Sequence, residues 1–271
     1  MFVFQESVDY AWRFLRPFSD ATIVNTPLSG RIALVTGASR GIGRATALAL
    51  AKAGAHVVAV ARTTGALEEL DDEIGAAGGT ATLVPLDMKD TDGIARLSAA
   101  LSERYSKLDI LVGNAGILGE LSPLSHVEPK VWDNVLAVNV TANWHLIRWM
   151  EPLLKQSDAG RAVFVTSALA WYGRAYWGPY SVSKSALNAM VQAWAAETAS
   201  TDLKVNLISP GLVGTRMLKQ AFPGRESEEF ESPDKVAEKI VELCLPSLQE
   251  TGLLYSYPAK KFLKLGEPTD I

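Results

Sequence analysis

The sequence lacks several features that would assign it to a specialised class of protein. It has a single cysteine, Cys244, in the apolar run VAEKIVELCL, so no internal disulfide can form, and we expect a cytoplasmic protein with this thiol packed in its core. No apolar run approaches the roughly 18 residues that a membrane span requires. A net charge of −4 gives no attraction to nucleic acid, and the three histidines, His56, His126 and His145, are too scattered to predict a metal site.

The N-terminal residues differ from the rest of the chain. Residues 1–28 show no strand pattern, but Val8, Trp12 and Leu15 have helical spacing. We interpret this segment as a partly helical extension that docks on the body of the protein or on a second subunit; contact with a membrane surface and a mobile extension are the alternatives. The length of the remainder, residues 29–271, suits one domain.

From residue 31 onward, short apolar runs alternate with helix-like stretches. RIALVTG, HVVAVAR and LKVNLISPG are typical of buried strands, and long helices are expected from about Pro129 to Leu154 and from about Tyr180 to Ala199. The chain closes with a helix near Asp234 to Leu245 and a strand in GLLYSY. This alternation predicts an α/β fold: a single Rossmann-like, doubly wound domain whose mostly parallel sheet has about seven strands and helices on both faces.

A glycine-rich loop, TGASRGIG, joins the first expected strand to the first helix. Gly37 permits a tight turn, while Gly41 and Gly43 let the backbone approach a pyrophosphate at the helix N-terminus, where free N–H groups favour negative charge. The spacing differs from the common G-x-G-x-x-G fingerprint, and a purely structural turn is the alternative. Its position between strand and helix favours dinucleotide binding.

The residues after the second strand indicate which dinucleotide binds. NAD sites usually have an acidic residue there to hold the ribose 2′-hydroxyl, but this chain has Ala61 and Arg62. Arg62 and Arg40 offer two guanidiniums for a 2′-phosphate, which predicts NADP(H); the alternative is that both are solvated surface charges. Asp87 is placed to accept a hydrogen bond from the adenine amino group, with helix capping as the competing role.

The strongest chemical signal is Ser167 at the end of the fifth strand, followed by YSVSK. Tyr180 and Lys184 are four residues apart, so on a helix they lie on one face. A tyrosine with its ordinary pKa near 10 is a poor acid or base at neutral pH, and a nearby ammonium lowers that pKa by stabilising the phenolate. Ser167 could then hydrogen-bond the substrate oxygen and align it for hydride transfer.

In this combination of motifs the chain resembles the short-chain dehydrogenases/reductases. The resemblance runs from about Arg31 to Tyr257 and rests on TGASRGIG, NAG, an asparagine in the long helix, Ser167, YSVSK and PGLVGT. It implies a catalytic tetrad of Asn139, Ser167, Tyr180 and Lys184, in which Asn139 holds a water that links Lys184 to solvent. It also implies that Lys184 bonds the nicotinamide ribose. The cofactor contacts expected from the residues and the resemblance together are Gly37, Ser39, Arg40, Gly41, Ile42, Gly43, Arg62, Asp87, Met88, Asn114, Ala115, Gly116, Tyr180, Lys184, Pro210, Gly211, Val213 and Thr215.

Large aromatic side chains gather between Ser167 and Tyr180. Trp171, Tyr172, Tyr176 and Trp177 could wall a pocket for a hydrophobic or aromatic carbonyl compound, or could pack at a subunit contact. Arg174, which lies among them, could meet an anionic group of the substrate or face water, and we favour water. Further pocket candidates are Leu118, Leu121 and Met217, and the polar segment 216–232 predicts a substrate lid.

These observations predict an NADPH-dependent oxidoreductase that acts on a small carbonyl or alcohol substrate. A nucleotide-sensing regulatory protein of the same fold is the main alternative, and an epimerase or dehydratase of the related extended group is another, although the chain lacks a longer C-terminal sugar-binding region. The resemblance implies a homodimer formed through the two long helices, or a homotetramer. The C-terminus departs from the Gly-Gly strand of acyl-carrier-protein reductases, which leaves the tetramer open.

Overall fold

The core of the protein is one sheet, seen in a computed structural model that describes residues 26–226 and 229–265. Within these residues the sheet has eight strands in the order β3-β2-β1-β4-β5-β6-β7-β8. The strands are β1 (Ile32–Thr36), β2 (His56–Ala61), β3 (Thr80–Pro85), β4 (Ile110–Gly113), β5 (Arg161–Val165), β6 (Lys204–Ser209), β7 (Leu253–Ser256) and β8 (Lys261–Lys264). The helix expected around Val8, Trp12 and Leu15 lies outside the described residues.

The sheet is parallel from β3 to β7, which confirms the Rossmann-like fold expected from the sequence. It has one strand more than expected, because β8 pairs antiparallel with β7. The sequence of this strand is KFLK. Because two of its four residues are lysines, it lacks the apolar run that is typical of a buried strand. Its Phe262 ring packs against Tyr255 of β7, with ring centroids 5.3 Å apart.

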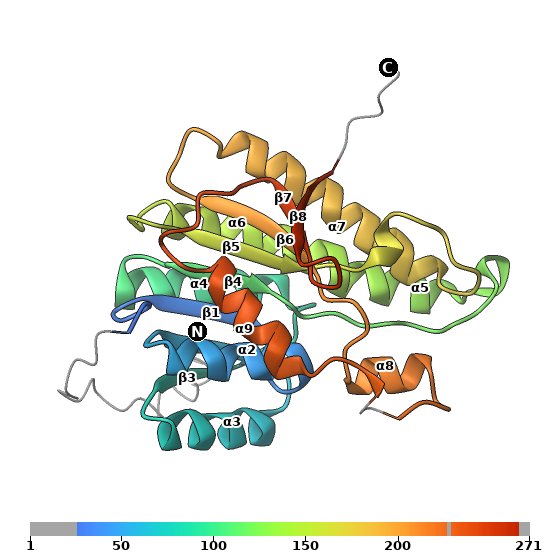
Figure 1. Cartoon of the computed structure of the whole chain (residues 1–271), viewed down its shortest axis with the longest axis horizontal. Coiled ribbons are helices and arrows are strands. Elements are labelled where there is room, and N and C mark those ends of the chain that lie inside the picture. The colour runs from blue at the N-terminus through green and yellow to red at the C-terminus, as the bar shows by residue number, and fades with distance from the viewer. Residues whose placement is uncertain (1–25, 227–228, 266–271) are drawn as a thin grey trace, which may run out of the picture.

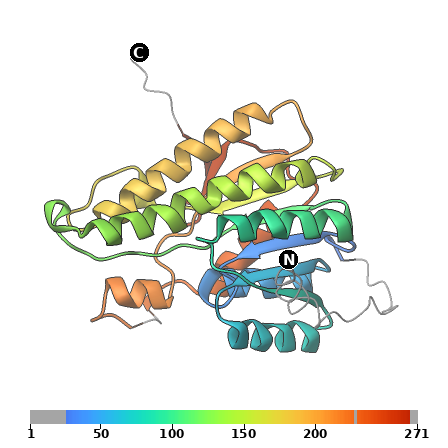
Figure 2. The same ribbon diagram turned by 180° about the vertical axis from the view of Figure 1, so that it is seen from behind.

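Helices cover both faces of the sheet (Figures 1 and 2). One face carries α2 (Gly41–Lys52), α3 (Thr64–Ala76) and α9 (Pro233–Leu243). The opposite face carries α4 (Thr91–Tyr105), α5 (Pro129–Leu136), the π-helix η2 (Ala137–Thr141), α6 (Ala142–Leu154) and α7 (Gly178–Glu197). The short helices η1 (Leu124–His126), η3 (Ala168–Ala170) and α8 (Arg216–Ala221) lie in the connecting loops.

The two helical layers enclose separate apolar cores. The central strands are buried along their whole length, with burial at every position of β1, β2, β4 and β5. Cys244 is buried in the core beneath α2 and α9, and burial raises the pKa of its thiol to about 12. No helix in the described part of the chain has the length and apolar character needed to cross a bilayer.

Candidate active site

A pocket of about 490 Å³ opens at the carboxyl ends of the parallel strands. Its walls come from the loops that follow β1 to β6, and it spans the point where the chain order reverses between β1 and β4. Crevices at such a reversal are the usual ligand sites of open α/β sheets. Of the site residues expected from the sequence, all except Gly43 and Asn139 line this pocket.

The glycine loop lets the backbone come close to a ligand at the start of α2. Gly37 has a φ of +68°, which favours glycine, and a Cβ on Gly43 would collide with the Asn114 side-chain amide and the Gly37 carbonyl. No side chain caps the N-terminus of α2, where Arg40 is the N-cap residue. The free N–H groups of the first turn therefore form a suitable cradle for a pyrophosphate.

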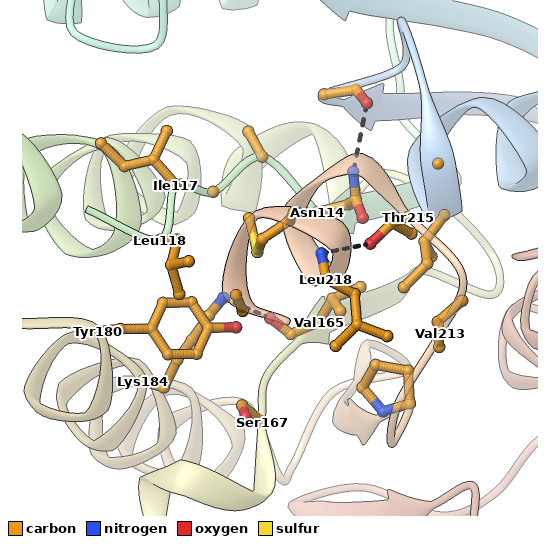
Figure 3. A pocket seen from close by; sticks show the side chains of 18 of the residues that line it. Asn114, Ile117, Leu118, Val165, Ser167, Tyr180, Lys184, Val213, Thr215 and Leu218 are labelled. Carbon is orange, nitrogen blue, oxygen red and sulfur yellow. Dashed lines mark hydrogen bonds between the residues drawn. The ribbon is translucent and has the colours of Figure 1, made fainter. Parts of the chain in front are cut away.

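Asn114 fastens this loop to the end of β4. Its backbone N–H donates to the Thr36 hydroxyl at 3.0 Å, and its side-chain amide donates to the Thr36 carbonyl at 2.9 Å. The backbone N–H of Ala115 donates to the same hydroxyl at 3.1 Å. Thr36 thus joins the ends of β1 and β4, and Asn114 supports the glycine loop as well as lining the pocket (Figure 3).

Two arginines stand at the far end of the pocket. Arg40 and Arg62 are both exposed, and neither makes an ion pair within the part of the chain that the structure describes. Asp87 lies nearby and accepts a hydrogen bond from the backbone N–H of Lys89 at 3.0 Å. Helix capping, the alternative role for Asp87, is wrong because Asp90 caps α4. This end of the pocket therefore offers two unpaired cations to an anionic ligand.

At the other end, Tyr180 and Lys184 project from α7 into the pocket, which Ser167, the second residue after β5, also lines (Figure 3). The Lys184 Nζ lies 5.8 Å from the centroid of the Tyr180 ring and donates to the Val165 carbonyl at 2.8 Å. Burial lowers the pKa of Lys184 to about 8. Burial also raises the pKa of Tyr180 to about 12, against an opposing effect of its hydrogen bond with Ser167.

This result differs from the expected direction for Tyr180. We expected the ammonium of Lys184 to lower the tyrosine pKa, but desolvation is the larger effect in the chain alone. The phenol is therefore held in its protonated form at neutral pH, although the raised pKa also makes it a weaker acid.

Asn139 lies behind the pocket in the π-helix η2, and it is fully buried. Its side chain accepts from the Ile117 N–H at 2.8 Å and donates to the Ile117 carbonyl at 2.9 Å. It also donates to the Ser183 hydroxyl at 2.9 Å, and that hydroxyl donates to the Tyr180 carbonyl at 2.7 Å. Asn139 thus links the loop after β4 to the turn of α7 that carries Tyr180. The predicted helix from Pro129 to Leu154 is interrupted here, as π-turns often are at functional sites.

The loop after β6 closes one side of the pocket. Thr215 caps α8, its hydroxyl accepting from the Leu218 N–H at 3.3 Å (Figure 3). Val213 forms an isolated bridge with Glu231. Pro210 and Gly211 contribute to the wall between these positions and β6.

An apolar cluster surrounds the side of the pocket next to Tyr180. Leu118, Leu169 and Trp177 are buried in it, and the partly buried members packed against them are Leu121, Tyr180, Met217, Ala221 and Phe222. Sequence reasoning missed Leu169 and Phe222, because Leu169 lies in an irregular loop and Phe222 lies in a segment that reads as a polar lid. Tyr172 lines the pocket, whereas Trp171 and Tyr176 do not and are 45% and 59% exposed.

Comparisons with known proteins agree with this geometry. A family model described as short chain dehydrogenase matches residues 31–226. The chain is 37% identical over 239 residues to the uncharacterized oxidoreductase YciK of Escherichia coli strain K12. The matched region covers 86% of this chain and 94% of YciK. It is 31% identical over 229 residues to the NADPH-dependent pterin aldehyde reductase of Arabidopsis thaliana, covering 84% and 93%. The crystal structure of a short chain dehydrogenase from Shigella flexneri complexed with NADP superimposes with a TM-score of 0.83 at 34% identity, covering 86% of this chain and 99% of that one.

Proposed function

The chain belongs to the short-chain dehydrogenase family, and on this premise we propose that it is an NADP-dependent oxidoreductase in which Tyr180 exchanges a proton with a carbonyl or alcohol substrate. The observation that carries the proposal is the presence, in one pocket, of Ser167, Tyr180 and Lys184 at one end and two unpaired arginines at the other.

The residues at the arginine end fit NADP(H). The uncapped N-terminus of α2 would hold the pyrophosphate, and Arg40 and Arg62 would hold the ribose 2′-phosphate. No carboxylate follows β2 to repel that phosphate or to hold a free 2′-hydroxyl. The relatives that are named for NADP or NADPH support the same cofactor.

The residues around Tyr180 have distinct chemical roles in this proposal. NADPH, when bound, supplies the hydride that the carbonyl carbon receives. The Tyr180 hydroxyl gives its proton to the carbonyl oxygen, so that an alcohol forms, and the Ser167 hydroxyl holds the same oxygen by a hydrogen bond. Lys184 stabilises the resulting phenolate, and the phenolate regains a proton from solvent. Asn139 positions Tyr180 through Ser183.

We also propose how the chain is organised beyond the site. Residues 29–271 form the NADP-binding domain, with residues 1–28 as an extension, and the protein acts in the cytoplasm. Two copies associate through the long helices of one face. Exposed apolar side chains on these helices support this, since Trp144 of α6 is 46% exposed and Val182 of α7 is 42% exposed.

A screen of ketones, aldehydes and quinones for NADPH oxidation tests the proposed activity. Tyr180→Phe should lower kcat by at least about 100-fold while leaving NADPH binding intact, because it removes only the donated proton. Tyr176→Phe is the matched control, since Tyr176 lies outside the pocket and should keep wild-type activity. Tight NADPH binding without turnover across the whole panel would instead favour a nucleotide-sensing protein.

A further inference from the structure

Arg174 occupies an unusual position at the rim of the pocket. Its guanidinium carbon lies 5.4 Å from the centroid of the Trp177 ring and 5.4 Å from that of the Phe222 ring. These two aromatic residues come from different segments, the loop before α7 and the turn after α8. Arg174 lines the pocket, and within residues 26–226 and 229–265 no carboxylate lies within ion-pair distance of it. Arg174 is exposed, as we expected from the sequence, but its guanidinium also contacts these two rings and borders the pocket.

The backbone around Arg174 is constrained. Tyr176 has a φ of +73°, which is unfavourable for a residue with a side chain. The turn is closed by a hydrogen bond from the Trp177 N–H to the Arg174 carbonyl at 3.1 Å. The Tyr176 carbonyl accepts from the Ser122 N–H at 3.1 Å, which fixes the turn to the loop after β4. Strained turns that their surroundings hold in place are common at ligand sites.

The charged side chains that line the pocket near Arg174 and Tyr180 are positive. The only acidic lining residue is Asp87, which lies at the opposite end beside Arg62. Near Tyr180 the walls are apolar side chains such as Leu118 and Met217, and Arg174 lies over two rings of the same cluster. Arg216 also lines the pocket. Arg174 is exposed at the rim of the pocket, and beside these apolar walls its charge is screened less than it would be in bulk water.

Arg174 contacts the two rings, but its guanidinium N–H groups have no hydrogen-bond partner in the part of the chain that the structure describes. A guanidinium beside aromatic rings can still donate from its N–H groups, which lie in its plane. These donors match the two oxygens of a carboxylate. We infer that the substrate is a carbonyl compound with an apolar body and a carboxylate, and that Arg174 binds the carboxylate while the carbonyl group lies at Tyr180. This inference rests on the proposed function of the same pocket.

Paired substrates test the inference. Aryl ketones that carry a carboxylate at increasing distance from the carbonyl are compared with their neutral methyl esters, with NADPH oxidation as the assay. The wild-type enzyme should prefer at least one acid over its ester by about tenfold or more in kcat/KM. Arg174→Met should lower kcat/KM for that acid by about 10- to 100-fold, mainly through KM, and should change the value for the ester by less than about twofold.

Further variants separate binding of the carboxylate from a structural role. Arg174→Lys keeps the charge without the planar fork and should restore part of the preference for the acid. Arg225→Met is the matched control: Arg225 also stacks on an aromatic ring, with its guanidinium carbon 4.6 Å from the Phe230 centroid, but does not line the pocket. It should leave the acid-to-ester ratio unchanged.

Several outcomes would overturn the inference. Three results would show that Arg174 does not bind a substrate carboxylate. The wild-type enzyme could prefer every ester over its acid, or Arg174→Met could lower kcat/KM equally for acid and ester. The preference for the acid could also be lost in Arg216→Met but kept in Arg174→Met. Turnover of neutral carbonyls alone would also reject it while leaving the oxidoreductase function intact. Failure of all carbonyl compounds would reject the proposed function itself.

Discussion

Replacing Lys184 by methionine should make the protein without bound cofactor more stable at neutral pH. The side chain is 4% exposed, and its burial lowers the pKa from 10.5 to about 8. This difference corresponds to about 3 kcal/mol of destabilisation at pH values below 8, where the buried amine carries its proton. Methionine removes that cost but leaves the Val165 carbonyl without its donor, at a loss of about 1 kcal/mol. The net gain should be about 2 kcal/mol.

The pH dependence gives this prediction its sign. Between about pH 8 and 10.5 the unfolded chain binds the lysine proton and the folded protein does not, so the stability of the wild-type protein rises through this window. The advantage of Lys184→Met should therefore shrink above pH 8 and be lost near pH 10. Higher pH is avoided because the raised pKa of Tyr180, about 12, adds an opposite slope above its ordinary value of 10.

Urea unfolding of both proteins without NADP, at pH values from 6 to 10, measures the difference. Lys89→Met, which changes an exposed lysine, is the control and should keep the wild-type pH dependence. The same Lys184→Met protein should lose hydride transfer. A variant that is less stable than wild type at pH 6, or a stability difference that stays constant with pH, would refute the reasoning from burial.

Two further predictions concern the cofactor end of the pocket. The double variant Arg40→Ala and Arg62→Ala should raise KM for NADPH by about 100-fold and leave KM for NADH unchanged, because it removes two charge-assisted contacts to a phosphate that NADH lacks; equal effects on both cofactors would reject a role in phosphate binding. Gly43→Ala should cost about 2 kcal/mol in thermal or urea unfolding and weaken NADPH binding, since its Cβ would collide with the Asn114 amide and the Gly37 carbonyl; an unchanged unfolding midpoint would contradict it.

Local patterns were sufficient to predict most of the fold. Strands such as Ile32–Thr36 and His56–Ala61 are buried on both faces, and their nearly continuous apolar sequences predict this burial. Right-handed crossovers between successive strands then predict a mostly parallel sheet. The spacing of Tyr180 and Lys184 on one helix likewise predicted two side chains that the structure brings into one pocket. Their catalytic roles remain predictions.

Features that depend on contacts distant in sequence could not be predicted. The stacking of Arg174 on Phe222 joins two loops whose approach depends on the whole sheet. The π-helix at Asn139 depends on hydrogen bonds to Ile117 and Ser183, which no helical pattern records. The direction in which the Tyr180 pKa shifts depends on how completely the folded protein excludes water from the phenol. The spacing of residues in the sequence does not predict this burial.

Burial acts on Tyr180 and Lys184 in opposite directions and for the same reason, since it favours the neutral form of each. Below pH 8 the ammonium of Lys184, 5.8 Å from the Tyr180 ring centroid, can offset part of the shift. At the effective dielectric constant of about 20 that suits protein sites, this attraction is worth about 3 kcal/mol. It acts only where the lysine is charged, and burial still raises the pKa of the phenol above its ordinary value. The chain by itself therefore holds Tyr180 in its protonated form at neutral pH, which is the form that the proposed carbonyl reduction requires.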